Sequence, residues 1–351
     1  MKYYPIIFLL ILIFKGCDQK NSIQKNWHIS PVKNLPVKTG NQAVSEGFIN
    51  GKPYLYSFGG LDSTKLFSGI HQRSFRFDIE NNIWTEIPSL PDTLGKIANA
   101  ASRINDTIYI MGGYHVFANG HERSSNRVHR FDIKNNVFLK DGSEIPIPID
   151  DHVQVVWKQK LIYIITGWSD HQNVPNVQIY DPVKNIWLQG TSVPDNDIYK
   201  SFGASGTIIG DTIYYFGGAA MGKNFPIQNY LRKGLIDPVN PTNITWSYQV
   251  IDSATTGYRM AASKHQNKAL WFGGSSNTYN YNGLAYDKSG GVEPNQRILS
   301  LNNEKFNFNF NKNLPMDLRG ITDINDSIKY LIGGMEKNQK VTNKVYKLAW
   351  K

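Results

Sequence analysis

One short pattern recurs six times along this chain and constrains the fold more than any other feature. Each copy is a run of aromatic and β-branched residues that ends in glycine, which is typical of a short strand followed by a tight turn. A repeat of roughly 50 residues indicates stacked structural units. The six copies are YLYSFGG (54–60), TIYIMGG (107–113), LIYIITG (161–167), TIYYFGG (212–218), KALWFGG (268–274) and IKYLIGG (328–334).

Three further strands are predicted within each repeat. A segment of small residues such as NAASRI (99–104) precedes the glycines, and a longer segment such as FRFDIENNIW (75–84) follows them. The longer segment predicts two strands joined by an Asp/Asn turn, because these side chains bond to their own backbone. Four strands per repeat, repeated radially, predict an all-β fold, a six-bladed β-propeller.

The repeats resemble those of the Kelch family. The resemblance rests on the double glycines, on an aromatic residue before each Asp/Asn turn and on a Trp or Phe after it. The aromatic residues are Phe77, Phe131 and Tyr180 before the turn, and Trp84, Phe138 and Trp187 after it. Three blades depart from the pattern: blade three has Thr166 in place of its first glycine, blade four has the variant LIDPVNPTNITW (235–246), and blade five inserts DKSGGVEPNQ (287–296) and lacks a clear Trp.

The last repeat stops after its third strand, VYKLAWK (345–351). Its missing fourth strand is predicted at the other end of the chain, because NWHISPVKNLP (26–36) reads like NNIWTEIPSLP (81–91). We therefore expect the N-terminal strand to pair into the last blade. Closing the ring in this way would remove exposed sheet edges, which promote aggregation.

The first residues indicate export. Lys2 precedes an apolar run from Ile6 to Phe14, which is too short to span a bilayer but typical of a signal peptide. Cys17, the only cysteine, follows Gly16, as in bacterial lipoprotein signals. The expected organisation is a signal peptide over 1–16, a tether over 17–25 lipidated at Cys17, and a propeller over 26–351. The expected location is the bacterial cell envelope, periplasmic or on the outer-membrane surface.

Charge adds little to this expectation. Removal of Lys2 and Lys15 would lower the formal net charge from +10 to +8, which favours an acidic partner or solubility alone. No Lys/Arg-rich run or nucleic-acid motif is present, so no nucleic-acid partner is expected. A lone cysteine cannot form an internal disulfide.

Candidate functional residues come from equivalent positions at the start of the innermost strands, which meet at one mouth of the central channel. Counting back fifteen residues from each final glycine gives Ser45, Ala98, His152, Gly203, Arg259 and Arg319. Asp150, Asp151, Tyr199, Lys200 and Tyr258 lie beside them. Arg259 and Arg319 would bind a substrate carboxylate, and Tyr199 and Lys200 are further candidate substrate-binding residues. His152 and Tyr258 are the candidate catalytic residues. The alternative is that the arginines bond to loop carbonyls.

Long loops after the double glycines open on the same face, at 113–127, 167–176, 218–233 and 274–283. They contribute His115, Trp168, His171 and Arg232 as candidate substrate-binding residues, because aromatic faces stack on sugar rings and loops on a rigid scaffold commonly carry function. The alternative is that the aromatic residues plug the channel. His115, His121 and His171 match no zinc spacing, so neither a metal nor another cofactor is expected.

Three functions remain open. Exported six-bladed Kelch proteins similar to this chain include the N-acetylneuraminate epimerases, so the resemblance implies an isomerase that acts on an acidic mono- or oligosaccharide. The second is a glycan-binding lipoprotein of an uptake system, and the third is a scaffold for an envelope protein partner. Copper chemistry of the galactose oxidase type is excluded, because it needs a Cys–Tyr crosslink and the sole cysteine lies in the export signal.

Overall fold

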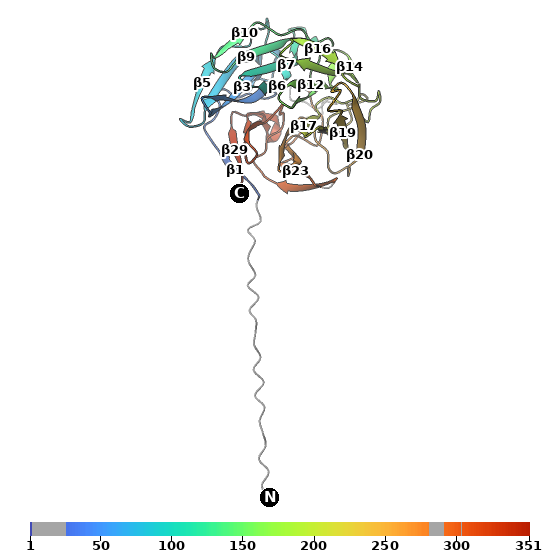
Figure 1. The fold of residues 1–351 in the computed structure, drawn as a ribbon. Coiled ribbons are helices and arrows are strands. Elements are labelled where there is room, and N and C mark those ends of the chain that lie inside the picture. Colours follow the sequence, from blue (N-terminus) through green and yellow to red (C-terminus); the bar gives the residue numbers. More distant parts are fainter. Residues whose placement is uncertain (2–25, 281–290, 303) are drawn as a thin grey trace.

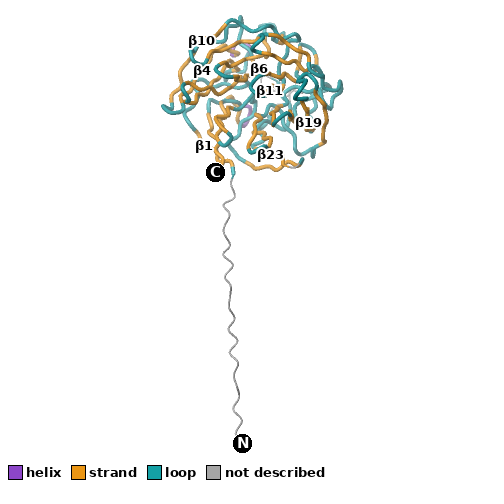
Figure 2. The backbone as a smooth tube through the Cα atoms, in the orientation of Figure 1, coloured by secondary structure: helices purple, strands orange, loops and turns teal. Residues whose placement is uncertain are grey.

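The chain folds into a closed ring of six four-stranded antiparallel blades (Figure 1). This computed structural model describes residue 1 and residues 26–280, 291–302 and 304–351. In Figure 2 the strands are arranged around a central axis and are connected by loops. The predicted all-β propeller of six blades is confirmed.

Each blade uses its first strand on the inside and its last on the rim. Blade one comprises β2 (Ala43–Ile49), β3 (Lys52–Leu61), β4 (Ile70–Asp78) and β5 (Ile83–Ile87). Blade two comprises β6 (Ile97–Ile104), β7 (Thr107–Val116), β9 (Val128–Asp132) and β10 (Val137–Leu139). Blade three comprises β11 (Val153–Trp157), β12 (Leu161–Ile165), β15 (Val177–Asp181) and β16 (Ile186–Gln189). Blade four comprises β17 (Ser205–Ile209), β18 (Thr212–Phe216), β19 (Tyr230–Ile236) and β20 (Ile244–Val250). Blade five comprises β21 (Ala261–His265), β22 (Lys268–Phe272), β23 (Arg297–Asn302) and β24 (Lys305–Phe310). Blade six comprises β25 (Thr322–Asn325), β26 (Ile328–Ile332), β29 (Val345–Trp350) and β1 (Trp27–Pro31).

Short elements decorate the loops that follow the double glycines. They are β8 (Glu122–Ser124), β13 (Trp168–Ser169), β14 (Gln172–Asn173), β27 (Met335–Glu336), β28 (Lys340–Val341) and the 3-10 turns η1 (Phe67–Gly69) and η2 (Lys337–Gln339). They lie on one face of the ring, which we call the loop face.

The ring closes as the sequence predicted. Strand β1 pairs with β29, with Trp27 opposite Trp350 and Pro31 opposite Tyr346. Trp27 is 7% exposed and its ring lies 5.8 Å from that of Phe272, so it joins blade six to blade five. Both described ends of the propeller therefore lie in blade six.

The double glycine is explained by close approach to the next blade. A Cβ on Gly217, whose φ is +71°, would lie 2.0 Å from the Gly257 carbonyl oxygen, and glycine alone fits there. Blade three breaks the rule with Thr166, whose φ is +44°. Its hydroxyl accepts a hydrogen bond from the Ser201 backbone N–H at 3.0 Å, so a side chain makes the inter-blade contact.

Apolar residues fill the wedges between blades, and every wedge draws on two neighbouring sheets. Between blades four and five, for example, the Phe306 ring lies 4.8 Å from Phe216 and 5.4 Å from Trp271. Phe306 thus supplies the aromatic residue that blade five was expected to lack. Among the described residues no helix is long and apolar enough to cross a bilayer. Cys17 lies outside the described residues.

Candidate functional site

A hydrogen-bonded ring of six backbone positions surrounds the propeller axis on the loop side. Each blade donates one N–H to the carbonyl of the preceding blade, at or just before the start of its innermost strand. The bonds run from Asn41 to Asp317, Ala98 to Asn41, Asp151 to Ala98, Gly203 to Asp151, Arg259 to Gly203 and Leu318 to Arg259. We call Asn41, Ala98, Asp151, Gly203, Arg259 and Asp317 the axial ring.

All six axial-ring residues have positive φ, between 46° and 66°. Asn, Asp and Gly tolerate this conformation, but it costs energy for Ala98 and Arg259. The circular hydrogen bonding sustains the strain: five of the residues both donate and accept, and at the sixth position Asp317 accepts from Asn41 while the adjacent Leu318 donates to Arg259. The left-handed turn also fixes where the side chains of Asp151, Arg259 and Asp317 are placed.

These side chains meet in a buried ionic cluster with Arg319, which we call the axial cluster. Arg259 Nη2 and Nε donate to the two carboxylate oxygens of Asp151 at 2.7 and 3.2 Å, and Arg259 Nη1 donates to Asp317 Oδ1 at 3.1 Å. Arg319 Nη1 lies 3.0 Å from Asp151 Oδ1. All four side chains are at most 3% exposed. The cluster joins blades three, five and six across the axis.

The two aspartates of the cluster differ electrostatically. Burial alone would raise the pKa of Asp151, but the Arg259 and Arg319 guanidinium groups outweigh it and hold that pKa below its usual value. Burial raises the pKa of Asp317, despite its contact with Arg259. Asp151 is therefore the firmly ionised partner of both arginines.

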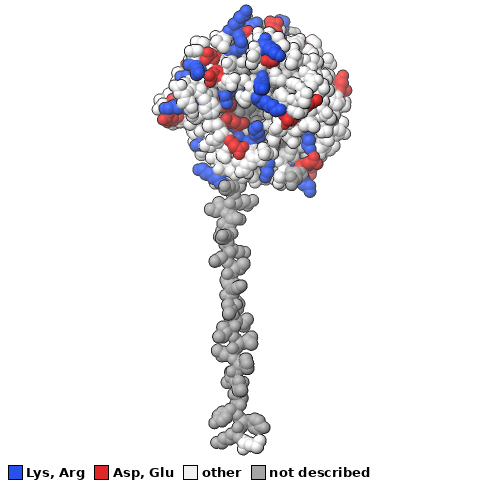
Figure 3. All heavy atoms as spheres, in the orientation of Figure 1, with Lys and Arg blue, Asp and Glu red and all other residues white. Residues whose placement is uncertain are grey.

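A polar cavity of about 350 Å³ occupies the channel on the strand side of the axial ring. All six blades line it, and Arg319 and His152 stand at its inner end beside the small residues Ala204 and Ser205. Blue and red side chains surround the central hollow of the face in view in Figure 3. Within the described chain, His152 Nδ1 and Arg319 Nε have no hydrogen-bond partner.

A second, smaller pocket of about 80 Å³ lies on the loop side of the ring. Its walls are Tyr114, Glu122, Asp150, Asp151, Trp168, Phe202, Phe225 and Arg259. Burial and the neighbouring Asp151 carboxylate raise the pKa of Asp150 well above its usual value, although Ser124 Oγ donates to Asp150 Oδ2 at 2.6 Å. Two neighbouring carboxyl groups of this pocket therefore have pKa values shifted in opposite directions, and we call Asp150 and Asp151 the carboxyl pair.

The structure brings Arg259 and Arg319 together through Asp151 and places His152 beside Arg319, but His152 and Tyr258 share no cavity. His152 lies in the channel cavity, where burial and Arg319 lower its pKa to about 4, and its Nε2 lies 3.0 Å from Gln154 Oε1. Arg319 donates from Nη2 to the His152 carbonyl at 2.8 Å. Arg259 belongs to the axial cluster, which lies between the two cavities. Tyr258 is fully buried, and its ring lies 5.8 Å from Phe202.

Three predicted binding residues gather in blade four instead. Arg232 is fully buried and donates to the carbonyls of Ile198 and Gly217 at 2.6 and 2.7 Å. Lys200 Nζ lies 2.7 Å from Asp195, and the Tyr199 carbonyl accepts a hydrogen bond from Tyr215. None of the three lines either cavity.

The loop residues are also divided. Trp168 walls the small pocket and is half-buried, 5.4 Å from Phe202 and 5.6 Å from Phe225. His171 is exposed at the turn between β13 and β14. Several loop-face aromatic residues thus pack over the channel, which is the alternative that the sequence left open.

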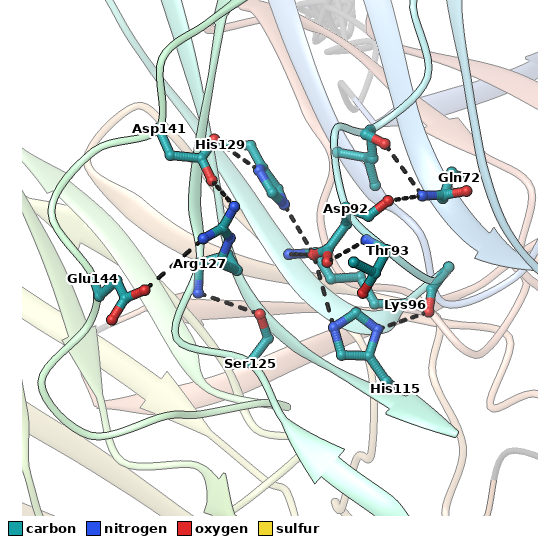
Figure 4. A network of polar contacts seen from close by, with 12 residues as sticks. Gln72, Asp92, Thr93, Lys96, His115, Ser125, Arg127, His129, Asp141 and Glu144 are labelled. Atoms are coloured by element: carbon teal, nitrogen blue, oxygen red, sulfur yellow. Dashed lines mark hydrogen bonds and ion pairs between the residues drawn. The ribbon is translucent and has the colours of Figure 1, made fainter. Parts of the chain in front are cut away.

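His115 belongs to a different cluster, at the junction of blades one and two (Figure 4). Its Nε2 lies 3.7 Å from Asp92, and its Nδ1 lies 3.0 Å from the Gly95 carbonyl. His129 bridges Asp92 and Asp141 at 3.2 and 3.0 Å, and Lys96 Nζ lies 3.3 Å from Asp92. We call this set the junction cluster. In the chain outside 2–25, 281–290 and 303, no three His, Cys, Asp or Glu residues form a group able to hold a metal ion.

Counting at fixed spacing located the ring only in part. It reached Ala98, Gly203 and Arg259, but it fell one residue past Asp151, two past Asp317 and four past Asn41. The missed signal is local: Asn, Asp and Gly are enriched where φ is positive, and such a residue stands near each counted position. Asp317 was not among the predicted residues.

The blades, the double-glycine turns and the axial ring define a repeat propeller, and comparison with known proteins gives its class. The KLHDC2/KLHL20/DRC7 Kelch-repeats domain matches residues 47–274, more than half of the chain. This chain belongs to the Kelch-repeat family, as the sequence predicted.

Individual relatives are distant. The chain is 24% identical to Kelch-like protein 36 of Mus musculus over 40% of its length and 22% of that protein, and 23% identical to Kelch-like protein 15 of Gallus gallus over 48% of its length and 32% of that protein. It therefore spans less than a third of these curated relatives. A solved structure of YjhT superposes with a TM-score of 0.69 at 17% identity, over 90% of this chain and 96% of that one, and so shares its fold.

Proposed function

We propose that this Kelch propeller binds a sugar at the loop-face pocket and catalyses its anomerisation. The observation that carries the proposal is the carboxyl pair, Asp150 and Asp151, whose pKa values are shifted in opposite directions within one aromatic-walled pocket. Groups whose environments separate their pKa values are suited to act as acid and base in one reaction.

The chemistry requires two proton transfers. Opening a sugar ring needs a base that takes the proton of the anomeric hydroxyl and an acid that protonates the ring oxygen. The lowered pKa of Asp151 suits it to be the base, and the raised pKa of Asp150 suits it to be the acid. Tyr114 and Trp168 would contact the apolar edge of the ring. His152 lies in the other cavity, and the proposal assigns it no proton transfer.

We also propose that the sugar carries an acidic substituent. This substituent would contact Arg259, whose charge is already paired with Asp151 and Asp317. A guanidinium group has five N–H donors. Arg259 commits three of its nitrogens to Asp151 and Asp317, so its remaining N–H groups would bind a sugar carboxylate. The positive net charge, +10 for the full chain and +8 without Lys2 and Lys15, favours the approach of such a substrate.

The test is exchange of anomers followed by nuclear magnetic resonance, with N-acetylneuraminate, glucuronate and their neutral counterparts. We expect the parent protein to accelerate exchange for an acidic sugar, and Asp150→Asn to lower the rate by about 10²-fold or more. Gln154→Ala, which alters the other cavity, is the matched control and should keep the rate. No acceleration over buffer for any of these sugars would remove the enzymatic proposal.

A second candidate function is binding without turnover, which the small volume of the pocket favours. At about 80 Å³ it would admit only one edge of a sugar, whereas pockets that enclose a ligand measure roughly 300–1,000 Å³. Titration calorimetry separates the two functions, because a binder would retain affinity for a sugar whose anomers exchange no faster than in buffer.

We also propose that the propeller is tethered to a membrane of the bacterial envelope through lipid on Cys17, from the apolar run 6–14 and Gly16–Cys17. Cys17→Ser should release the protein into the soluble fraction or leave a larger, unprocessed precursor. Normal processing with unchanged membrane fractionation would contradict the anchor.

A further inference from the structure

The rim of blade five carries two phenylalanines that its fold does not use. Strand β24 reads KFNFNF, and its first phenylalanine, Phe306, already packs against Trp271 and Phe216 as the blade pattern requires. Phe308 and Phe310 remain 52% and 72% exposed and contact each other with ring centroids 5.4 Å apart. They are the most exposed aromatic side chains among the described residues.

An exposed apolar edge strand is a liability unless something covers it. Its six residues are rich in phenylalanine and, apart from Lys305, uncharged, which is the composition of segments that pair with other chains. Either a partner or a lipid surface would relieve the exposure, and the position of β24 in the ring decides between them.

Strand β24 lies beside the point where the N-terminal segment enters the propeller. Asn309, between the two phenylalanines, donates from Nδ2 to Asn26 Oδ1 at 3.0 Å. Asn26 directly precedes β1, and a shared hollow between blades five and six is lined by Trp27, Trp350, Asn307 and Asn309. Figure 1 shows β1, the C-terminus and β23 on neighbouring parts of the ring.

The length of chain before Asn26 keeps this part of the rim near a membrane. Residues 18–25 separate Asn26 from Cys17, and a chain of that length reaches at most about 30 Å. A lipid on Cys17 would therefore keep the point where the chain enters the propeller, between blades five and six, within that distance of the bilayer.

The charges beside the patch suit an anionic surface. Lys268, Lys305, Lys312 and Lys351 are exposed. Lys268 lines the hollow on the Asn307 and Asn309 face of β24, which is opposite to the face of Phe308 and Phe310. The nearby carboxylate of Glu304 is bound to Lys233 at 2.5 Å. Aromatic residues flanked by lysines are typical of segments that insert into the headgroup region.

We propose that Phe308 and Phe310, with these lysines, form a membrane-docking patch that seats the rim of blade five on an anionic lipid surface. The proposal rests on the proposed anchor for its geometry, and it adds to the anchor a fixed orientation of the propeller. Two contacts, one lipid chain and one patch, bind far more stably than either alone.

The test uses a chain that begins at residue 21, because every described strand begins at or after Trp27. We expect it to co-sediment with vesicles of phosphatidylglycerol and phosphatidylcholine in equal amounts, less so with phosphatidylcholine alone, and less at high salt. Replacement of both phenylalanines (Phe308→Ser and Phe310→Ser) should lower the bound fraction at least about fivefold. Val183→Ser and Val239→Ser are matched controls, since both valines are 91% exposed on other blades.

Two results would overturn the docking patch. One is equal vesicle binding by the parent and the doubly substituted chain. The other is a concentration-dependent oligomer that the double substitution abolishes while neither chain binds vesicles, which would make the patch a protein interface. Failure of the anchor is read separately, from Cys17→Ser in the full chain, because the vesicle assay lacks residues 1–20.

Discussion

The axial cluster and the junction cluster are both buried sets of charged side chains, and they differ in their surroundings. In the axial cluster Asp151, Arg259, Asp317 and Arg319 are at most 3% exposed, and a cavity lies on each side of them. The junction cluster leads outward from buried Lys96 through Asp141, 19% exposed, to Arg127, 43% exposed.

The two clusters also draw on different parts of the ring. The junction cluster joins two adjacent blades, through Asp92 and Lys96 in the connection between them and His129 in β9. The axial cluster joins three blades across the axis. Buried charge alone therefore does not mark a functional site in this protein. The axial cluster differs in that a cavity lies on each side of it, which makes it the candidate site.

The largest expected effect is the loss of stability caused by Arg259→Ala. The substitution would leave Asp151 with Arg319 as its only ionic partner and Asp317 with none, inside a buried layer. Removing one partner of a buried ion pair costs about 3–5 kcal/mol. Urea unfolding should show this loss in the free energy of unfolding.

The matched control is Arg73→Ala, because Arg73 pairs with Glu86 on the surface, where both side chains are nearly half exposed. Such pairs contribute about 0–1 kcal/mol. Equal losses for the two variants would mean that the axial cluster stabilises the fold no more than a surface pair does.

The second effect is a pH dependence contributed by His152. Its pKa is lowered from 6.5 to about 4 in the folded protein, so between these values the unfolded chain binds more protons. Stability must then fall as pH drops from 6.5 towards 4, by about 3 kcal/mol from this residue. We expect His152→Asn to flatten the decline in the free energy of unfolding over this range.

The exposed His28 provides the control, and His28→Asn should leave the decline as it is in the parent. If the His152→Asn protein lost stability over pH 6.5–4 as steeply as the parent, the channel cavity would be hydrated well enough to accept the imidazolium ion.

The fold was predicted well from the sequence because it depends on short local patterns that recur in every blade. Glycines, Asp/Asn turns and aromatic residues recur in each blade, and the match of Trp27 to Trp84 predicted the closing strand. Blade three keeps the fold although Thr166 stands in place of the first glycine, because the Thr166 hydroxyl makes the contact to the next blade by accepting a hydrogen bond from the Ser201 N–H.

The site was predicted less completely, for two physical reasons. The number of residues between the axial ring and the double glycine of the same blade varies, so a constant count fell one residue past Asp151 and two past Asp317, which long-range backbone hydrogen bonds place on the axis. Ionic partners are also set by three-dimensional packing. Nothing in the spacing shows that Arg259 is paired with Asp151, more than a hundred residues away.

The smallest change in the free energy of unfolding is expected for Lys96→Met, and this variant tests the difference between the two clusters most directly. Lys96 is fully buried, burial lowers its pKa to about 8, and its Nζ lacks a hydrogen-bond partner among the described residues. Asp92 would keep the His129 ring at 3.2 Å and the Thr93 backbone N–H at 2.8 Å. Because desolvation of the ammonium group offsets its attraction to Asp92, we expect a change of about 1 kcal/mol or less, of either sign. Urea unfolding of Lys96→Met beside Arg259→Ala measures it, and a loss of about 3 kcal/mol would show that both clusters stabilise the ring alike.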